Sequence, residues 1–120
     1  MNCIRGAVSV DNYDKNHIEQ RVNEMFSEIM KENDIEKIYS IIFSVTPDIK
    51  TVNPATIVRK SFNLDKTAFM CFQEAMFENS PEKIIRILVN CESRKIKYVY
   101  LYKAADLRNI PEVHDDIQSI

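Results

Sequence analysis

The sequence has 120 residues, of which 45% are apolar and 28% charged, and its formal net charge is −2. That balance is typical of one ordinary globular domain, and it excludes a broadly cationic surface of the kind that binds nucleic acid. The only glycine is Gly6, which excludes the phosphate loops of nucleotide-binding domains because those loops need several glycines.

The first half of the chain predicts a strand, a long helix and a second strand. Cys3–Val10 is a largely apolar strand with Arg5 in its interior. Lys15–Asn33 is a helix, because its apolar residues recur with a helical period. The charged residues of its other face, Arg21 among them, are expected to be solvated. Lys37–Val45 is almost continuously apolar, which predicts a central strand that is buried on both faces.

The second half predicts a short helix and three more strands. The short helix begins at Asn53-Pro54, since asparagine caps helices and proline suits their first position. The remaining elements are a strand over Lys66–Glu74, a single helical turn over Ser80–Lys83, a strand over Ile84–Cys91 and a strand over Lys97–Lys103. In the last strand Tyr98, Tyr100 and Tyr102 are expected to share one face.

These elements indicate a single domain over residues 1–108 and a C-terminal tail over 109–120 that is polar and expected to be loose. The fold class is α+β, a mixed five-stranded sheet with one long helix and short helical turns. One substantial helix covers only one face of such a sheet. The other face is apolar and needs a partner, which predicts a homo-oligomer.

The three cysteines, Cys3, Cys71 and Cys91, are odd in number and lack a CxxC spacing. That usage indicates a reducing compartment rather than a disulfide scaffold or a zinc site. The N-terminal residues do not resemble a signal peptide, and no apolar run has the length of a membrane span. We therefore expect a cytoplasmic protein with no membrane or nucleic-acid partner.

Arginines within apolar segments are the strongest functional signal. Arg5 and Arg86 lie in predicted strands, Arg59 lies on the short helix, and Arg108 ends a mostly apolar segment. Because a guanidinium stays charged, each could form a structural ion pair or extend to water. Several together favour a shared anionic ligand, since the planar fork of arginine matches carboxylates.

Glu74 and Cys71 are two further candidates. Glu74 ends the third predicted strand, where an exposed acid without function would be equally ordinary. Cys71 lies on the opposite face under strict alternation, so both reach one ligand only if the strand bulges or ends between them. A buried cysteine is more often a small apolar residue than a nucleophile. No catalytic base, metal cluster or cofactor motif accompanies them, and we expect neither metal nor cofactor.

Six segments in order, IRGAVSV, FSVTPDI, NPATIVRKS, CFQE, IIRILV and VYLYKAADLR, together resemble the monofunctional, trimeric α/β-class chorismate mutases of the Bacillus type. The likeness runs from about Ile4 to Arg108. It implies an isomerase of the shikimate pathway that rearranges chorismate to prephenate in phenylalanine and tyrosine biosynthesis. It also implies a homotrimer that forms a pseudo-α/β barrel, with an active site at each subunit interface.

The resemblance also implies roles for individual residues. Arg86 would face the ether oxygen of the substrate, Arg5 would hold a carboxylate, and Glu74 would accept a hydrogen bond from the ring hydroxyl. Cys71 would lie beside that hydroxyl, and Tyr100 near the substrate side chain. Four more residues would line the margin, the first two of them from a neighbouring subunit: Arg59, Ala55, Leu107 and Arg108.

Two segments depart from the family pattern. Asn53 and Thr56 stand where members often carry an aromatic residue and a lysine, and ENSPEK replaces a glycine-rich turn before the IIRILV segment. Two alternative functions are considered. A trimeric imine deaminase-like protein would have glycine-rich signatures, and a non-catalytic module for small carboxylates would have no need of Glu74 and Cys71.

Overall fold

The structure, a computed structural model, describes residues 1–108. The predicted tail over 109–120 lies outside the described residues, and so do the side chains of Leu107 and Arg108. The elements in chain order are β1 (Asn2–Ser9), α1 (Lys15–Glu32), β2 (Ile35–Val45), α2 (Pro54–Ser61), β3 (Ala68–Gln73), β4 (Ile84–Ser93), β5 (Val99–Leu101) and a 3₁₀ helix, η1 (Tyr102–Arg108).

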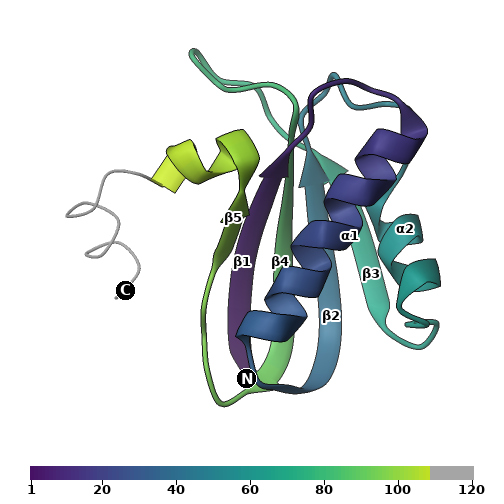
Figure 1. Cartoon of the computed structure of the whole chain (residues 1–120), viewed down its shortest axis with the longest axis vertical. Helices are drawn as coiled ribbons and strands as arrows, with labels where there is room; N and C mark the ends of the chain where they lie inside the picture. Colours follow the sequence, from purple (N-terminus) through teal and green to yellow (C-terminus); the bar gives the residue numbers. More distant parts are fainter. Residues whose placement is uncertain (109–120) are drawn as a thin grey trace.

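The five strands form one mixed sheet in the order β3-β2-β4-β1-β5. The pairs β1–β4 and β2–β4 are antiparallel, whereas β2–β3 and β1–β5 are parallel. Both α helices cover the same face of this sheet (Figure 1). The predicted α+β class and mixed five-stranded sheet are therefore confirmed.

The core lies between the sheet and the two helices. Asp14 caps α1 by accepting a hydrogen bond from the His17 N–H, and the helix then presents one apolar stripe to the sheet. The stripe residues that are fully or almost fully buried are Ile18, Val22, Met25, Phe26 and Ile29. Each buried side chain of this size stabilises the fold by about 1.5–3 kcal/mol. Phe26 also meets Phe62 beyond the end of α2, edge to face at 4.7 Å, which ties the two helices together.

Gly6 lies in β1 at a point where the strand is close to both β5 and α1. A Cβ atom at this position would lie 2.9 Å from the Val99 carbonyl oxygen of β5 and 3.2 Å from the Ile29 side chain of α1. Its backbone is not left-handed, so the glycine provides space and not conformational freedom. The close parallel pairing of β1 with β5 depends on that space.

The end of β5 differs from the prediction. The strand stops at Leu101 because Tyr102 adopts a left-handed conformation, with a φ of 59°, and η1 begins there. The Tyr102 hydroxyl donates a hydrogen bond to Glu24 of α1 at 2.5 Å, and its ring lies under the Arg21 guanidinium at 3.5 Å. The prediction that Tyr102 shares a face with Tyr98 and Tyr100 is therefore wrong.

Arg21 was expected to be solvated, and that prediction is also wrong. It is only 8% exposed, and it donates to the Ser9 carbonyl oxygen and to Asp11, each at 2.7 Å. Its helical position lies next to the apolar stripe, so the guanidinium reaches the end of β1 instead of water. Arg21 thus joins α1, β1 and the start of η1.

The segment before β4 contains no helical turn at Ser80–Lys83, contrary to the prediction. Asn79 and Lys83 instead have left-handed φ values of 66° and 59°. A glycine-rich turn would adopt such values freely. Here an asparagine adopts one of these values, and the lysine is held because its N–H donates to Asp48 and its carbonyl oxygen accepts from the Val10 N–H.

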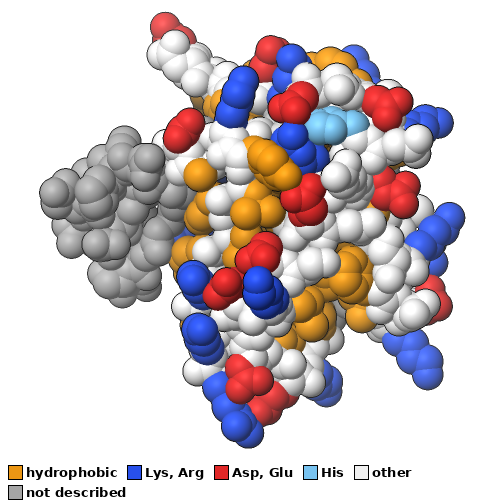
Figure 2. Space-filling view, in the orientation of Figure 1, with side chains coloured by type: hydrophobic (Ala, Val, Ile, Leu, Met, Phe, Trp, Pro, Cys, Tyr) orange, Lys and Arg blue, Asp and Glu red, His pale blue; other side chains and the backbone are white. Residues whose placement is uncertain are grey.

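The opposite face of the sheet is not covered by either α helix. Met70 and Phe72 of β3 lie on it and are 56% and 49% exposed. Figure 2, in the orientation of Figure 1, shows the other, helix-covered side of the molecule, which carries interspersed charges of both signs and no broad cationic patch. Among residues 1–108, no helix is long and apolar enough to cross a membrane.

Candidate active site

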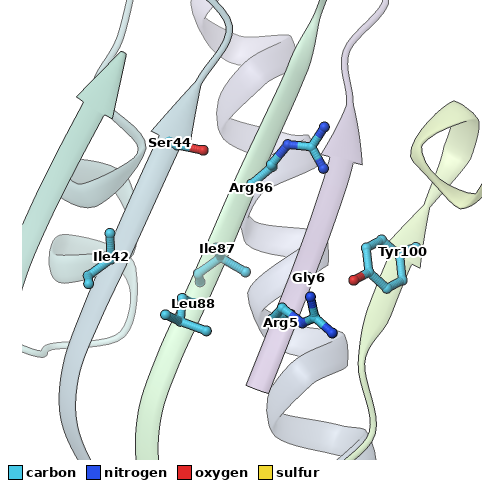
Figure 3. A pocket seen from close by; sticks show the side chains of 8 residues that line it. All are labelled: Arg5, Gly6, Ile42, Ser44, Arg86, Ile87, Leu88 and Tyr100. Atoms are coloured by element: carbon cyan, nitrogen blue, oxygen red, sulfur yellow. The ribbon is translucent and has the colours of Figure 1, made fainter. Parts of the chain in front are cut away.

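The uncovered face of the sheet contains a hollow of about 270 Å³. Side chains from β1, β2, β4 and β5 line it, and Figure 3 shows them from close by. The lining residues are Arg5, Gly6, Ile42, Ser44, Arg86, Ile87, Leu88 and Tyr100. Two guanidinium groups therefore border a partly apolar depression, an arrangement that suits a small anion with an apolar body.

Arg86 is held at one end of the hollow by Glu74. Its Nε donates to both carboxylate oxygens of Glu74, at 3.0 and 3.2 Å, and the Ser44 hydroxyl lies 3.3 Å from one of them. The two side chains are 35% and 25% exposed, so the pair is open to a ligand. Because the pair uses Nε, the terminal nitrogens can serve a ligand, and Figure 3 shows them directed over β1.

Glu74 follows Gln73, the last residue of β3. Its N–H donates to the Val45 carbonyl oxygen at 2.7 Å, and it keeps the alternation of β3, which places it on the same face as Met70 and Phe72. Its side chain turns to the uncovered face, where Ser44 and Arg86 lie opposite one another in the β2–β4 register. Cys71 faces the helices, so the end of β3 before Glu74 does not bring these two side chains to one hollow within the protomer.

Arg5 and Tyr100 border the other side of the hollow. Arg5 lies opposite Leu88 in the β1–β4 register, and its guanidinium stands 4.7 Å from the centre of the Tyr98 ring. Tyr100 packs against a small cluster of Ala7, Ile84 and Ala104. Arg5, Arg86 and Tyr100 thus come together on one face, although β4 and β5 are separated by β1.

The other predicted site residues lie elsewhere in the protomer. Cys71 is opposite Phe43 in the β2–β3 register and packs against the core on the helix-covered face, where burial raises the pKa of its thiol. Ala55 and Arg59 lie on α2 in the helix layer, and Arg59 pairs with Asp65 at 3.2 Å. The predicted contributions of Leu107 and Arg108 fall on side chains outside the described residues.

Sequence reasoning did not find every residue of the hollow. It missed Ser44, Ile42 and Leu88, although strand alternation places all three on the Arg86 face once the register is known. It also did not foresee that Glu74 would form an ion pair with Arg86. That pair joins β3 and β4, and their order in the sheet cannot be read from either segment alone.

The fold and the hollow define a class of protein, a small α+β protein with a hollow bordered by two arginines on the open face of its sheet. Among residues 1–108, no group of three or more histidine, cysteine, aspartate or glutamate side chains could hold a metal ion. The comparisons with known proteins narrow this class to one family.

Residues 1–110 match the family described as chorismate mutase type I. The chain is 30% identical over 111 residues to chorismate mutase AroH of Bacillus subtilis, covering 88% of this chain and 87% of that protein. It is 27% identical over 112 residues to chorismate mutase AroH of Thermus thermophilus, covering 88% and 91%. A solved chorismate mutase from Clostridium thermocellum is similar with a TM-score of 0.82 and 33% identity, covering 88% of this chain and 99% of that one.

The chain belongs to the chorismate mutase type I family. The predicted family, fold class and enzyme class, an isomerase of aromatic amino acid biosynthesis, are confirmed. The two alternative functions, an imine deaminase-like protein and a non-catalytic carboxylate-binding module, are not favoured.

Proposed function

We propose that this protein rearranges chorismate to prephenate in the hollow between Arg5, Arg86 and Tyr100. The observation that carries the proposal is that Glu74 holds Arg86 beside a second guanidinium on an open, partly apolar surface. The reaction is an intramolecular [3,3] rearrangement, in which the ether C–O bond breaks as a new C–C bond forms. Nothing is added or lost, so positioning and electrostatic stabilisation are sufficient catalytic devices.

The proposed roles of the two arginines follow from their positions on β4 and β1. Arg86 donates its terminal N–H groups to the ether oxygen, where negative charge grows as the C–O bond stretches. A donor fixed in advance stabilises that charge more than it stabilises the ground state, which lowers the barrier. Arg5, across the hollow, holds a substrate carboxylate with its planar fork. Both groups lie on paired strands, so their positions are rigid.

Glu74 and Tyr100 complete the proposed site within one protomer. Glu74 keeps acceptor capacity beyond its bonds to Arg86 and Ser44, since an ionised carboxylate has about four lone-pair positions. It accepts the hydrogen bond of the ring hydroxyl in this proposal. Tyr100 contacts the side chain of the substrate next to Arg5.

We further propose that the remaining site residues come from a neighbouring copy in a homotrimer that forms a pseudo-α/β barrel. Cys71, Ala55 and Arg59 lie on the far side of their own sheet from Arg86, so they cannot enter the same hollow. A neighbour packed on the uncovered face would bury the apolar residues Met70 and Phe72. It could at the same time bring its α2 and β3 to the rim. Leu107 and Arg108 are proposed to line the margin.

Location in the cytoplasm is also part of the proposal. All three cysteines within residues 1–108 are free, and the thiol of Cys3 is exposed. Exposed thiols are typical of proteins in a reducing compartment.

The experiment that tests the function follows the loss of chorismate absorbance with purified protein, without metal or nucleotide, and identifies the product. Conversion to prephenate is expected. Arg86→Ala, made and purified in the same way, controls for a contaminating mutase. Chorismate binding without turnover would instead support the non-catalytic carboxylate-binding module, and loss of chorismate to a different product would contradict the assigned reaction.

A further inference from the structure

The segment Thr46-Pro47-Asp48, which follows β2, is not part of the hollow, yet it contacts both strands that carry the ion pair. Since β2 lies between β3 and β4, this segment extends between the end of β3 and the start of β4. On the β3 side, the Gln73 side-chain amide lies 3.4 Å from the Pro47 carbonyl oxygen, and the Glu74 N–H donates to Val45.

On the β4 side, the contacts are denser. The Thr46 N–H donates to the Ile84 carbonyl oxygen at 3.1 Å, and the Ile84 N–H donates to the Thr46 hydroxyl at 3.2 Å. Thr46 is fully buried, so this exchange of hydrogen bonds fixes the first residue of β4. Arg86 follows two residues later on the same face as Ile84.

Asp48 makes the remaining contacts, with residues from two other loops. One of its carboxylate oxygens accepts hydrogen bonds from the Tyr13 hydroxyl at 2.8 Å and from the Lys83 N–H at 3.0 Å. The Lys83 carbonyl oxygen accepts from the Val10 N–H at 2.9 Å. Lys83 has a left-handed φ of 59°, which a residue with a Cβ rarely adopts without such support.

From these contacts we propose that Asp48 is a positioning residue for the rearrangement: it fixes the Lys83 backbone and thereby sets where β4 presents Arg86 to Glu74. The inference rests on the proposed function for its kinetic consequence. Without the carboxylate, the left-handed Lys83 loses its acceptor and can relax. The start of β4 then shifts relative to Glu74, and the donor at the ether oxygen is misplaced.

The test compares Asp48→Ala with Asp48→Asn, which keeps an acceptor oxygen, and with the matched control Asn2→Ala. The Asn2 side chain accepts the Ser93 N–H at 3.0 Å, the same type of contact at the other end of β4 and far from Arg86. Asp48→Ala is expected to lower kcat by roughly tenfold to a hundredfold, the scale for a displaced catalytic group, with a smaller change in KM. Asp48→Asn should restore most of kcat, and Asn2→Ala should keep it.

A double-mutant cycle separates positioning from general damage. If Asp48 acts through Arg86, adding Asp48→Ala to Arg86→Ala should cost less than about twofold in the residual rate. Equal losses in both backgrounds would overturn the proposal. Lys83→Gly, added to Asp48→Ala, should recover part of kcat together with stability, because glycine adopts the left-handed conformation without the support of Asp48. Recovery of stability without any recovery of kcat would contradict a route through the Lys83 backbone.

A readout without substrate distinguishes failure of this inference from failure of the proposed function. The NMR signal of the Arg86 Nε–H, bound to Glu74, should be protected from exchange in the wild type and in Asn2→Ala. It should lose that protection in Asp48→Ala. Unchanged protection would contradict the inference even if chorismate is converted, and a wild type that fails to convert chorismate would contradict the proposed function alone.

Discussion

Glu74 and Arg86 form an ion pair across the strand that separates their own two strands. Glu74 follows β3, Arg86 lies in β4, and β2 runs between them, with Ser44 below the carboxylate. Glu74 directly follows β3 and reaches across β2 to the guanidinium, so the pair depends on how the ends of β3 and β4 are aligned by the loop that follows β2. The pair is also the feature whose removal should be most informative.

Removal of the Arg86 guanidinium should abolish most of the activity while the fold survives. Arg86→Ala is expected to lower kcat by about 10²–10³, the scale for one preorganised donor. Arg86→Lys should also be poor, because an ammonium lacks the planar fork. Arg94→Ala is the matched control, since Arg94 pairs with Glu36 on the surface, is 77% exposed and lies far from the hollow. An Arg86→Ala variant with a near wild-type rate would refute the assignment of Arg86.

Mixed assemblies should reveal a site shared between subunits. Arg86→Ala and Arg59→Ala chains are each expected to be impaired alone. Unfolded together and refolded as an equimolar mixture, they should regain about a quarter of the wild-type rate, because in a cyclic trimer that fraction of interfaces pairs an intact Arg86 with an intact Arg59. Sedimentation would establish the oligomeric state. No recovery in a mixed trimer would place both arginines in the same subunit's site.

Arg21 should contribute to stability more than to catalysis. Arg21→Ala removes two hydrogen bonds from a buried guanidinium and its contact with Tyr102, so it should lower the free energy of unfolding by about 2–3 kcal/mol. Lys31→Ala, which removes an exposed pair with Glu28, should change it by less than about 0.5 kcal/mol. Urea unfolding at matched protein concentration measures both, and equal effects would contradict the structural role of Arg21.

The Asp48–Tyr13 contact should be visible in titrations. Partial burial acts to raise the pKa of Asp48, but hydrogen bonds from Thr46, Tyr13 and backbone N–H groups outweigh it, so the net pKa lies below its usual value. The same contact, chiefly the hydrogen bond to Asp48, raises the pKa of Tyr13 to about 12. Asp48→Asn should therefore bring the pKa of Tyr13 down towards about 10, as measured by ultraviolet titration.

The sign for stability follows from the depressed pKa. The ionised form of Asp48 is favoured in the fold, so its contribution is present above the ordinary pKa of about 3.9 and is lost as pH falls through the lower folded value. The stability difference between wild type and Asp48→Asn should shrink over that acid range. For Tyr13 the contribution is present below about 10 and is lost as pH rises through about 12. If the stability difference between wild type and Asp48→Asn did not depend on pH, it would contradict this link between the Asp48–Tyr13 contact and stability.

The sequence was sufficient for features that depend on local periodicity. The stripe of α1, the apolar run of β2 and the arginines within strands each follow from one segment, and in the structure Arg5 and Arg86 line one hollow. Features that depend on contacts between segments were not accessible in this way. Tyr102 adopts its left-handed conformation against Arg21 and Glu24, some eighty residues earlier in the chain. Nothing within the KYVYLYK segment indicates that Tyr102 would contact Arg21 and Glu24.

The same distinction explains the errors at other positions. A helical turn was predicted over Ser80–Lys83, whereas Asp48 and Val10 hold Lys83 in a left-handed conformation. Alternation correctly separated Cys71 from Glu74, but only the structure shows that Cys71 faces the helices. The roles of Cys71, Ala55 and Arg59 remain predictions about a neighbouring subunit.

Because Gly6 has no side chain, α1 and the edge strand β5 can both approach β1 closely, next to the hollow. A methyl group there would act as a wedge, since Val99, Ile87 and Ile29 all lie within 3.2 Å of its position. The wedge would push β5 outward and carry Tyr100 with it, because Tyr100 directly follows Val99. The residues that this position tolerates are thus limited by the space between β1 and its neighbours. A larger side chain would widen the hollow before it unfolded the protein.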